Sequence, residues 1–240
     1  KCNSSYKDLI NNCNIIFVCL PTPMNEDGSC NVELVREVFV KLNNETKAIV
    51  VNKSTVVPGT TEVFNQEFKN LQIVFNPEFL TERNSEQDFN NQNRIILGGP
   101  RPATTELKQI YSIVFPNAYV IKTGSKHAEM IKYFTNCFLA NKVSFANEMH
   151  SLCSALDLDY DKVVEYASLD KRLGNSHWAV PGPDGDLGFG GHCFPKDLSA
   201  IIKITNDLGT INNILKSVQK TNDKVRNNRD WENMKGRAIN

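Results

Sequence analysis

An excess of charge, a long apolar run and a secretory leader are all missing from this sequence of 240 residues. Lys and Arg together number 27, as do Asp and Glu, so the formal net charge is zero. This balance argues against a general nucleic-acid or membrane-surface binder, which would carry a basic excess. No apolar run approaches the roughly 20 residues of a membrane span, and no charged-then-apolar segment opens the chain. We therefore expect neither nucleic acid nor a membrane as a partner.

Cysteine pairs in the C-x-x-C spacing are also missing, although the chain holds seven cysteines. An odd number without such pairs argues against a disulfide framework and against a zinc site. Reduced thiols in a cytoplasmic protein without a bound metal fit this pattern better.

The first half of the sequence alternates short apolar runs with helical patterns. Such alternation indicates a parallel α/β sheet. The expected strands are Ile15–Leu20, Ala48–Val51, Ile73–Phe75, Ile95–Leu97 and Tyr119–Ile121, and the expected helices are Val32–Leu42, Thr60–Lys69 and about Thr104–Val114.

A glycine-rich G-x-G-x-x-G turn is the remaining absence. A dinucleotide-binding sheet opens with a strand, this turn and a helix, but none of them precedes Asn14. We therefore expect residues 1–122 to be the later part of a Rossmann-like domain whose first βαβ unit is missing. The chain would then be a fragment of a longer protein.

The second half has a different pattern. From Ser125 to Leu156 no Gly or Pro occurs, which predicts an amphipathic helix of about 30 residues, roughly 45 Å long. We expect a connecting helix over residues 123–157 and a helical domain over residues 158–240. Further helices are expected at Asp161–Ser168 and Pro195–Leu208, and the basic tail from Lys216 is expected to be an exposed helix.

The most unusual segment is Gly188–Asp197, with the sequence GFGGHCFPKD. Paired glycines allow a close approach of the backbone to a ligand. Cys193 follows them at an expected helix N-terminus, where a thiolate is favoured. A buried, inert thiol is the usual state of a single cysteine, but the flanking Gly-Gly and Lys-Asp favour a nucleophile here.

This segment resembles the catalytic-cysteine motif of the UDP-glucose/GDP-mannose dehydrogenase family. Four more segments resemble family motifs in the same order: Val18–Pro23 (VCLPTP), Lys53–Gly59 (KSTVVPG), Asn76–Glu82 (NPEFLTE) and Glu129–Glu148, the long central helix. The resemblance runs from about residue 13 to about residue 222. Five motifs in order are far more specific than a single glycine pattern.

The resemblance implies a two-step, four-electron oxidation of a sugar nucleotide by NAD, most simply of UDP-glucose to UDP-glucuronate. A thiolate adds to the intermediate aldehyde, and the resulting thioester is hydrolysed. Such a site needs a nucleophilic thiol, a cation for the developing oxyanion, and groups that hold a water molecule.

The resemblance also implies roles for individual residues. Cys193 would be the nucleophile, Lys132 would stabilise the oxyanion, and Asn136 would lie one helical turn further on. Asp197 would position or deprotonate water. Thr55 and Glu82 would hold that water or contact the cofactor.

Contacts with the two ligands are implied in the same way. NAD would be contacted by Thr22, Thr55, Glu82 and Lys196. The sugar nucleotide would be contacted by Lys132 and Asn136 and also by Glu78, Phe79, Leu80, Arg172, Phe189 and Gly190. Glu78 could equally be a structural carboxylate at a strand end. Family members lend the residue matching Arg172 to a neighbouring subunit, which implies a homodimer.

Three other interpretations remain open from the sequence. The substrate could be a UDP-N-acetylhexosamine or GDP-mannose. The chain could be a non-catalytic fragment. A hydroxy-acid dehydrogenase shares the half-sheet and long-helix plan, but that chemistry does not use the Gly-Gly-x-Cys motif.

Overall fold

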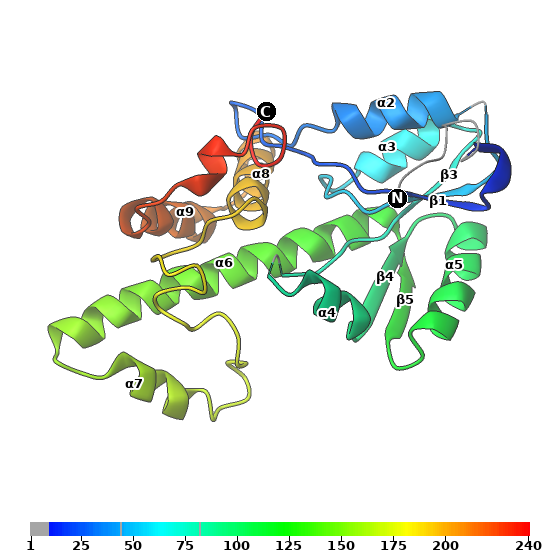
Figure 1. Ribbon diagram of the computed structural model, residues 1–240. Coiled ribbons are helices and arrows are strands. Elements are labelled where there is room, and N and C mark those ends of the chain that lie inside the picture. Colours follow the sequence, from blue (N-terminus) through cyan, green and yellow to red (C-terminus); the bar gives the residue numbers. More distant parts are fainter. Residues whose placement is uncertain (1–9, 44, 82) are drawn as a thin grey trace. The chain divides into compact units, whose positions relative to one another are not determined.

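The computed structural model describes residues 10–43, 45–81 and 83–240 (Figure 1). The chain forms two compact units. Unit 1 contains the residues up to Thr22 together with Asn31–Lys132, and unit 2 contains Pro23–Cys30 and Tyr133–Asn240. The boundary between the units falls inside helix α6, Ser125–Ala155.

Unit 1 is built on a five-stranded sheet with the order β1-β2-β3-β4-β5. The strands are β1 (Ile15–Val18), β2 (Ile49–Asn52), β3 (Gln72–Phe75), β4 (Arg94–Gly98) and β5 (Tyr119–Thr123). The α/β class expected from the alternating pattern is confirmed. The buried strands β2, β3 and β4 are apolar almost throughout, as strands covered on both faces must be.

One strand pair departs from the expected parallel arrangement. Strands β3 and β4 pair antiparallel through Phe75 and Gly98, while β1–β2, β2–β3 and β4–β5 are parallel. A parallel connection needs a crossover, usually a helix that packs across the sheet. Among the described residues between β3 and β4 the one helix is the short α4 (Ser85–Asn90), so the chain turns back without such a crossover. The predicted parallel sheet is therefore present with one antiparallel pair.

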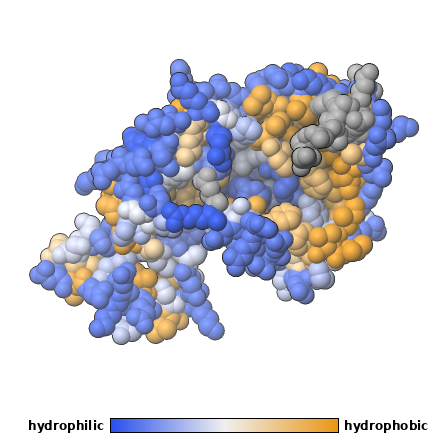
Figure 2. Space-filling model, in the orientation of Figure 1, coloured by the Kyte–Doolittle hydropathy of each residue, from blue (hydrophilic) through white to orange (hydrophobic). Residues whose placement is uncertain are grey.

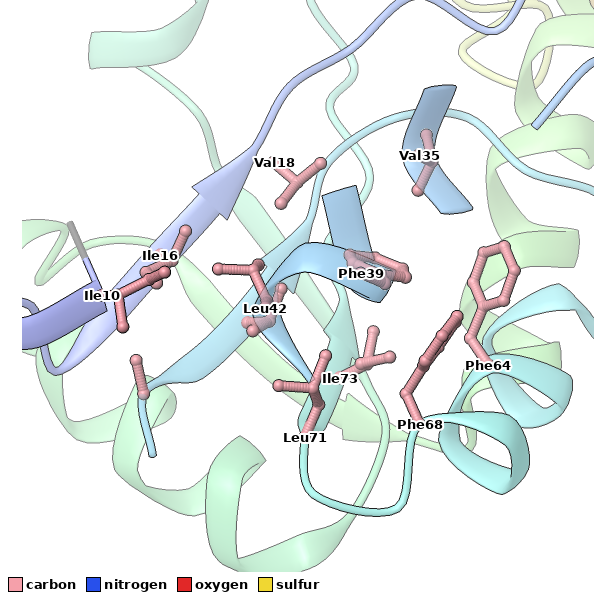
Figure 3. Close-up of a cluster of buried hydrophobic side chains, with 12 residues drawn as sticks. Ile10, Ile16, Val18, Val35, Phe39, Leu42, Phe64, Phe68, Leu71 and Ile73 are labelled. Carbon is pink, nitrogen blue, oxygen red and sulfur yellow. The ribbon is translucent and has the colours of Figure 1, made fainter. Parts of the chain in front are cut away.

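Helices cover the sheet and close the core of unit 1. They are α2 (Glu33–Leu42), α3 (Thr60–Glu67) and α5 (Arg101–Val114). Figure 3 shows Phe39 of α2 and Phe64 of α3 in one cluster with the strand residues Val18 and Ile73. The rings of Phe39 and Phe64 lie edge to face with their centroids 5.1 Å apart, a preferred aromatic geometry. This packing holds the carboxyl ends of β1, β2 and β3 at one edge of the sheet.

Unit 2 is helical among its described elements. It contains the rest of α6, followed by α7 (Tyr160–Ala167), α8 (Cys193–Asp207), α9 (Asn213–Val225) and a 3-10 turn, η1 (Asp230–Asn233). The predicted long helix and the helix starting near Pro195 are both present. No helix in the described part of the chain is long and apolar enough to cross a membrane.

The tail differs from the exposed helix predicted from the sequence. Helix α9 ends at Val225, and the chain then folds back so that Trp231 and Ala238 are buried. The amide of Met24 donates to the carbonyl of Ala238 at 2.8 Å, and Asn240 N donates to Met24 O at 2.9 Å. The prediction is wrong because the helical pattern does not reveal these contacts between the tail and Met24.

Candidate active site

The ends of β1 and β2 carry the predicted threonines of unit 1. Thr22 is buried, and its hydroxyl donates to the carbonyl of Thr55 at 2.7 Å. The amide of Leu20 donates to the Ser54 hydroxyl at 2.8 Å. These bonds join two chain segments that leave adjacent strands, and the carboxyl ends of such strands are the usual ligand edge of an open α/β sheet.

Glu78 and Lys132 form a salt bridge within unit 1. The Lys132 side chain is only 3% exposed, and its Nζ lies 2.8 Å from Glu78 Oε1. The same Nζ donates to the Glu78 carbonyl at 2.6 Å, and Leu80 N donates to Glu78 Oε2 at 2.7 Å. Burial alone would raise the pKa of Glu78, but the Lys132 ammonium outweighs it and the pKa is lowered. The structure thus holds an ionised carboxylate beside a nearly buried ammonium.

Lys53 supports the segment that carries Glu78, a role that the sequence analysis did not assign. Its Nζ lies 3.1 Å from Asn76 Oδ1 and 3.3 Å from the Asn76 carbonyl. Tyr111 donates to the same Oδ1 at 2.6 Å, and Asn76 Nδ2 donates to Ile96 O at 2.9 Å. Burial lowers the pKa of Lys53. The signal in the sequence that could have identified Lys53 is its position directly after an apolar strand, as the first residue of KSTVVPG.

Phe79 lies between two cations. The Lys132 ammonium is 5.6 Å from its ring centroid and the Arg94 guanidinium is 4.2 Å away, both within the range of cation–π attraction. This contact and the bond from Leu80 N to Glu78 fix the backbone of residues 78–80. The predicted backbone contacts of Phe79 and Leu80 with a ligand remain a prediction.

Cys193 is the first residue of α8, with His192 at the N-cap position. The expected helix N-terminus is therefore present. The preceding glycines Gly188 and Gly191 have φ values of 66° and 68°, in the left-handed region that favours glycine. A thiol at this position lies at the positive end of the helix dipole, which favours the thiolate.

Asp197 lies one helical turn after Cys193 and is 1% exposed. Its Oδ2 accepts from Asn136 Nδ2 at 2.6 Å, and its Oδ1 pairs with Lys196 Nζ at 2.6 Å. Burial alone would lower the pKa of Lys196, but the Asp197 carboxylate reverses this and raises it. Three predicted residues from two helices thus meet in one buried network.

The ammonium of Lys196 is engaged in this network. Its predicted contact with NAD remains a prediction, since the observed partner of its Nζ is a neighbouring carboxylate.

The loop before Cys193 is tied to helix α9 within unit 2. Phe189 N donates to Asn222 Oδ1 at 2.7 Å, and Asn222 Nδ2 donates to Phe189 O at 3.0 Å. Gly191 N donates to both carboxylate oxygens of Asp230 at 3.1 and 3.2 Å. Phe189 and Gly190, the predicted sugar contacts, are therefore in a loop with defined backbone positions.

The other predicted residues fall into three groups. Arg172 is 87% exposed at its side chain and pairs with Asp170. Its contact with a neighbouring subunit remains a prediction. Glu82 lies outside the described residues. Lys132 and Asn136 lie one turn apart on α6, but on opposite sides of the boundary between the units.

Within residues 10–43, 45–81 and 83–240, no group of His, Cys, Asp and Glu could hold a metal ion.

Comparison with known proteins identifies the family. Residues 1–115 match the NAD binding domain of the UDP-glucose/GDP-mannose dehydrogenase family, and residues 126–224 match the family's central domain. The chain belongs to the UDP-glucose/GDP-mannose dehydrogenase family.

Individual relatives agree with this assignment. UDP-glucose 6-dehydrogenase of Pseudomonas aeruginosa is 35% identical over 222 residues, covering 87% of this chain and 48% of the relative. UDP-glucose 6-dehydrogenase AglM of Haloferax volcanii is 36% identical over 227 residues, covering 86% of this chain and 51% of the relative. The chain thus spans about half the length of these relatives.

A solved UDP-glucose dehydrogenase from Pyrobaculum islandicum superimposes with a TM-score of 0.83 at 32% identity, covering 92% of this chain and 53% of that one. A Mycobacterium tuberculosis 3-hydroxyisobutyrate dehydrogenase has a TM-score of 0.69 at 15% identity. The second match concerns the fold alone.

Proposed function

We propose that this chain contributes to the NAD-dependent oxidation of UDP-glucose to UDP-glucuronate, with Cys193 as the nucleophile. The observation that carries the proposal is the position of Cys193 at the N-terminus of α8, one turn before the buried Asp197 network. A thiolate is stabilised there by the helix dipole. The family membership supports the same chemistry.

NAD, when bound, supplies the acceptor for the two hydrides that leave the C6 carbon. The residues around the carboxyl ends of β1 and β2 fit a ribose of NAD, because hydroxyl and backbone groups gather there. Thr22 and Thr55 would hold the cofactor at this edge. Glu82 and Lys196 remain further proposed contacts.

The protein residues would divide the remaining work. Cys193 would add to the aldehyde to form a thiohemiacetal, and the second oxidation step of the reaction would convert this thiohemiacetal to a thioester. Lys132 would stabilise the oxyanion of these tetrahedral species, and Asp197, with Thr55 and Glu82, would position the hydrolytic water. Asn136 and Asp197 would orient the reacting groups. Oxyanion stabilisation of this kind is usually the largest single contribution to catalysis.

Substrate contacts and assembly form the second part of the proposal. Phe79, Leu80, Phe189 and Gly190 would contact the sugar nucleotide through their backbones, and Arg172 would reach a second copy of the chain. The homodimer would use α6, because large apolar side chains remain exposed along it at Phe134, Phe138, Phe145 and Leu152.

Figure 2 shows orange apolar patches among blue polar side chains where α7 and the end of α6 lie, at the lower left.

We also propose a cytoplasmic location for the protein.

The test is the NADH yield from each sugar nucleotide. Purified protein is mixed with limiting UDP-glucose, UDP-N-acetylglucosamine or GDP-mannose and excess NAD, and the absorbance of NADH is followed. We expect two NADH per UDP-glucose, and loss of uronate formation in Cys193→Ala. Cys153→Ala, which removes a different thiol, serves as the control and should retain the yield.

Other outcomes would redirect the proposal. Two NADH from another sugar nucleotide would change the substrate but keep the mechanism. One NADH per sugar, unaffected by Cys193→Ala, would contradict the covalent mechanism. No NADH from any of them would favour a non-catalytic fragment.

A further inference from the structure

Arg226 is a buried cation that the proposed chemistry does not use. It directly follows α9 in unit 2, and its side chain is 1% exposed. A buried charge requires partners, because the loss of its hydration is costly. The partners of Arg226 lie on both sides of it along the chain.

The first set of partners belongs to the loop before Cys193. Arg226 Nη1 lies 2.6 Å from Asp184 Oδ2 and donates to the Leu187 carbonyl at 3.4 Å. Its Nε lies 3.6 Å from Asp186 Oδ2. One guanidinium thus contacts three positions within four residues of the loop.

The second set belongs to the chain after α9. Arg226 Nε donates to the Asn228 carbonyl at 2.7 Å, and Nη2 lies 3.4 Å from Asp230 Oδ1. Asp230 in turn accepts from Gly191 N. The guanidinium also packs so closely under Gly190 that a Cβ there would overlap Nη2. The loop is therefore bound to this arginine by charge, by a carbonyl and by direct packing.

We infer that Arg226 is a positioning residue that holds residues 184–191, and through them the backbone of Phe189 and Gly190, in the conformation required for sugar-nucleotide binding. This inference rests on the proposed function for the ligand, and on the contacts of Arg226 for the loop. A guanidinium suits the task because its planar fork binds several acceptors in fixed directions, whereas a lysine ammonium is a point charge.

The variants separate charge from fork geometry. Arg226→Gln removes both, and Arg226→Lys keeps the charge alone. Asp184→Asn removes one loop partner whose side chain is 40% exposed, so this variant should fold. Arg229→Gln is the matched control, because Arg229 is three residues away, is 44% exposed and pairs with Asp223 and Glu232.

The first readout is limited cleavage by chymotrypsin after Leu187 or Phe189, followed by mass spectrometry on the full chain. Loss of a charge-assisted contact should raise local opening, and hence cleavage, about tenfold in Arg226→Gln and less in Arg226→Lys and Asp184→Asn. Arg229→Gln should cleave like the unsubstituted protein. Cleavage unchanged in Asp184→Asn and in a folded Arg226→Gln, judged by circular dichroism, overturns the inference.

If Arg226→Gln fails to fold, Asp184→Asn decides alone.

The second readout is steady-state kinetics. A positioning role predicts that KM for the sugar nucleotide rises about tenfold while kcat falls less, with partial rescue by lysine. A fall in kcat alone, with KM unchanged, contradicts the assignment to substrate binding. If the unsubstituted protein oxidises no sugar nucleotide, the proposed function fails, but the cleavage assay still decides whether Arg226 holds the loop.

Discussion

Glu78 in unit 1 and Asp197 in unit 2 are both paired with a lysine, yet their environments differ. Glu78 is 28% exposed at its side chain, and one of its oxygens is bound by a backbone amide. Asp197 is 1% exposed, and both of its oxygens are bound by side chains. The comparison indicates that the Glu78 carboxylate remains accessible to solvent, whereas the Asp197 carboxylate holds Asn136 and Lys196 in a buried network.

The largest expected effect comes from breaking the buried pair in unit 2. Asp197→Ala leaves the Lys196 ammonium buried without its carboxylate, which should lower the free energy of unfolding by about 3–5 kcal/mol. Urea denaturation followed by circular dichroism measures this loss. Glu78→Ala is the matched variant and should cost less, because Lys132 Nζ keeps its bond to the backbone carbonyl of residue 78 and the carboxylate removed is 28% exposed. Equal losses would remove the distinction between the two carboxylates.

A smaller effect is expected in the pH dependence of stability, where Glu78 can be compared with Glu129. Glu129 is fully buried and accepts from Gly59 N at 2.6 Å and Thr61 N at 2.8 Å. Burial raises the pKa of Glu129 above 4.5, while that of Glu78 lies below 4.5. The two carboxylates should therefore contribute slopes of opposite sign.

The signs follow from proton binding. Folded Glu129 holds its proton more tightly than the unfolded chain does, so its contribution to stability falls as the pH rises from 4.5 through its folded pKa. The stability contributed by Glu78 is present above 4.5 and is lost as the pH falls through its lowered pKa. Urea titrations of Glu129→Gln and Glu78→Gln between pH 3 and 8 measure both. If stability changed with pH in the same direction for both carboxylates, the idea that the Lys132 cation acts on Glu78 but not on Glu129 would be contradicted.

The smallest effect is expected at His192, which precedes Cys193. Adjacent residues rarely face each other in a productive way, so we expect His192→Ala to retain activity within about tenfold, less than a typical general base contributes. The measurement is kcat for uronate formation, with Cys193→Ala as the inactive reference. A loss as large as that of Cys193→Ala would indicate that His192 acts as a catalytic base, so that an imidazole would have to be considered beside the paired carboxylates and lysines.

The strands and helices could be predicted because apolar periodicity reflects burial directly. Ile49–Asn52 is buried along its whole length, and α6 ends within one residue of the predicted Leu156. The helix start at Cys193 followed from the paired glycines before it. Local patterns thus carried most of the fold.

What could not be predicted depends on contacts between distant residues. The antiparallel pairing of Phe75 with Gly98 depends on the path of the connection between them, which no periodicity records. The role of Arg226 depends on Asp184, 42 positions earlier. The bond from Lys53 to Asn76 likewise joins the ends of two strands.

Asn222 and Gly188 impose a joint restriction on the evolution of this chain. The Asn222 amide meets both the N–H and the carbonyl of Phe189, as a paired β-strand residue would. Aspartate lacks the donor, and glutamine is one methylene too long. A Cβ at position 188 would overlap the Asn222 oxygen. Two positions far apart in the sequence are therefore linked: a homologue with a side chain at position 188 should also have lost Asn222, whereas loss of Asn222 alone leaves the glycine in place.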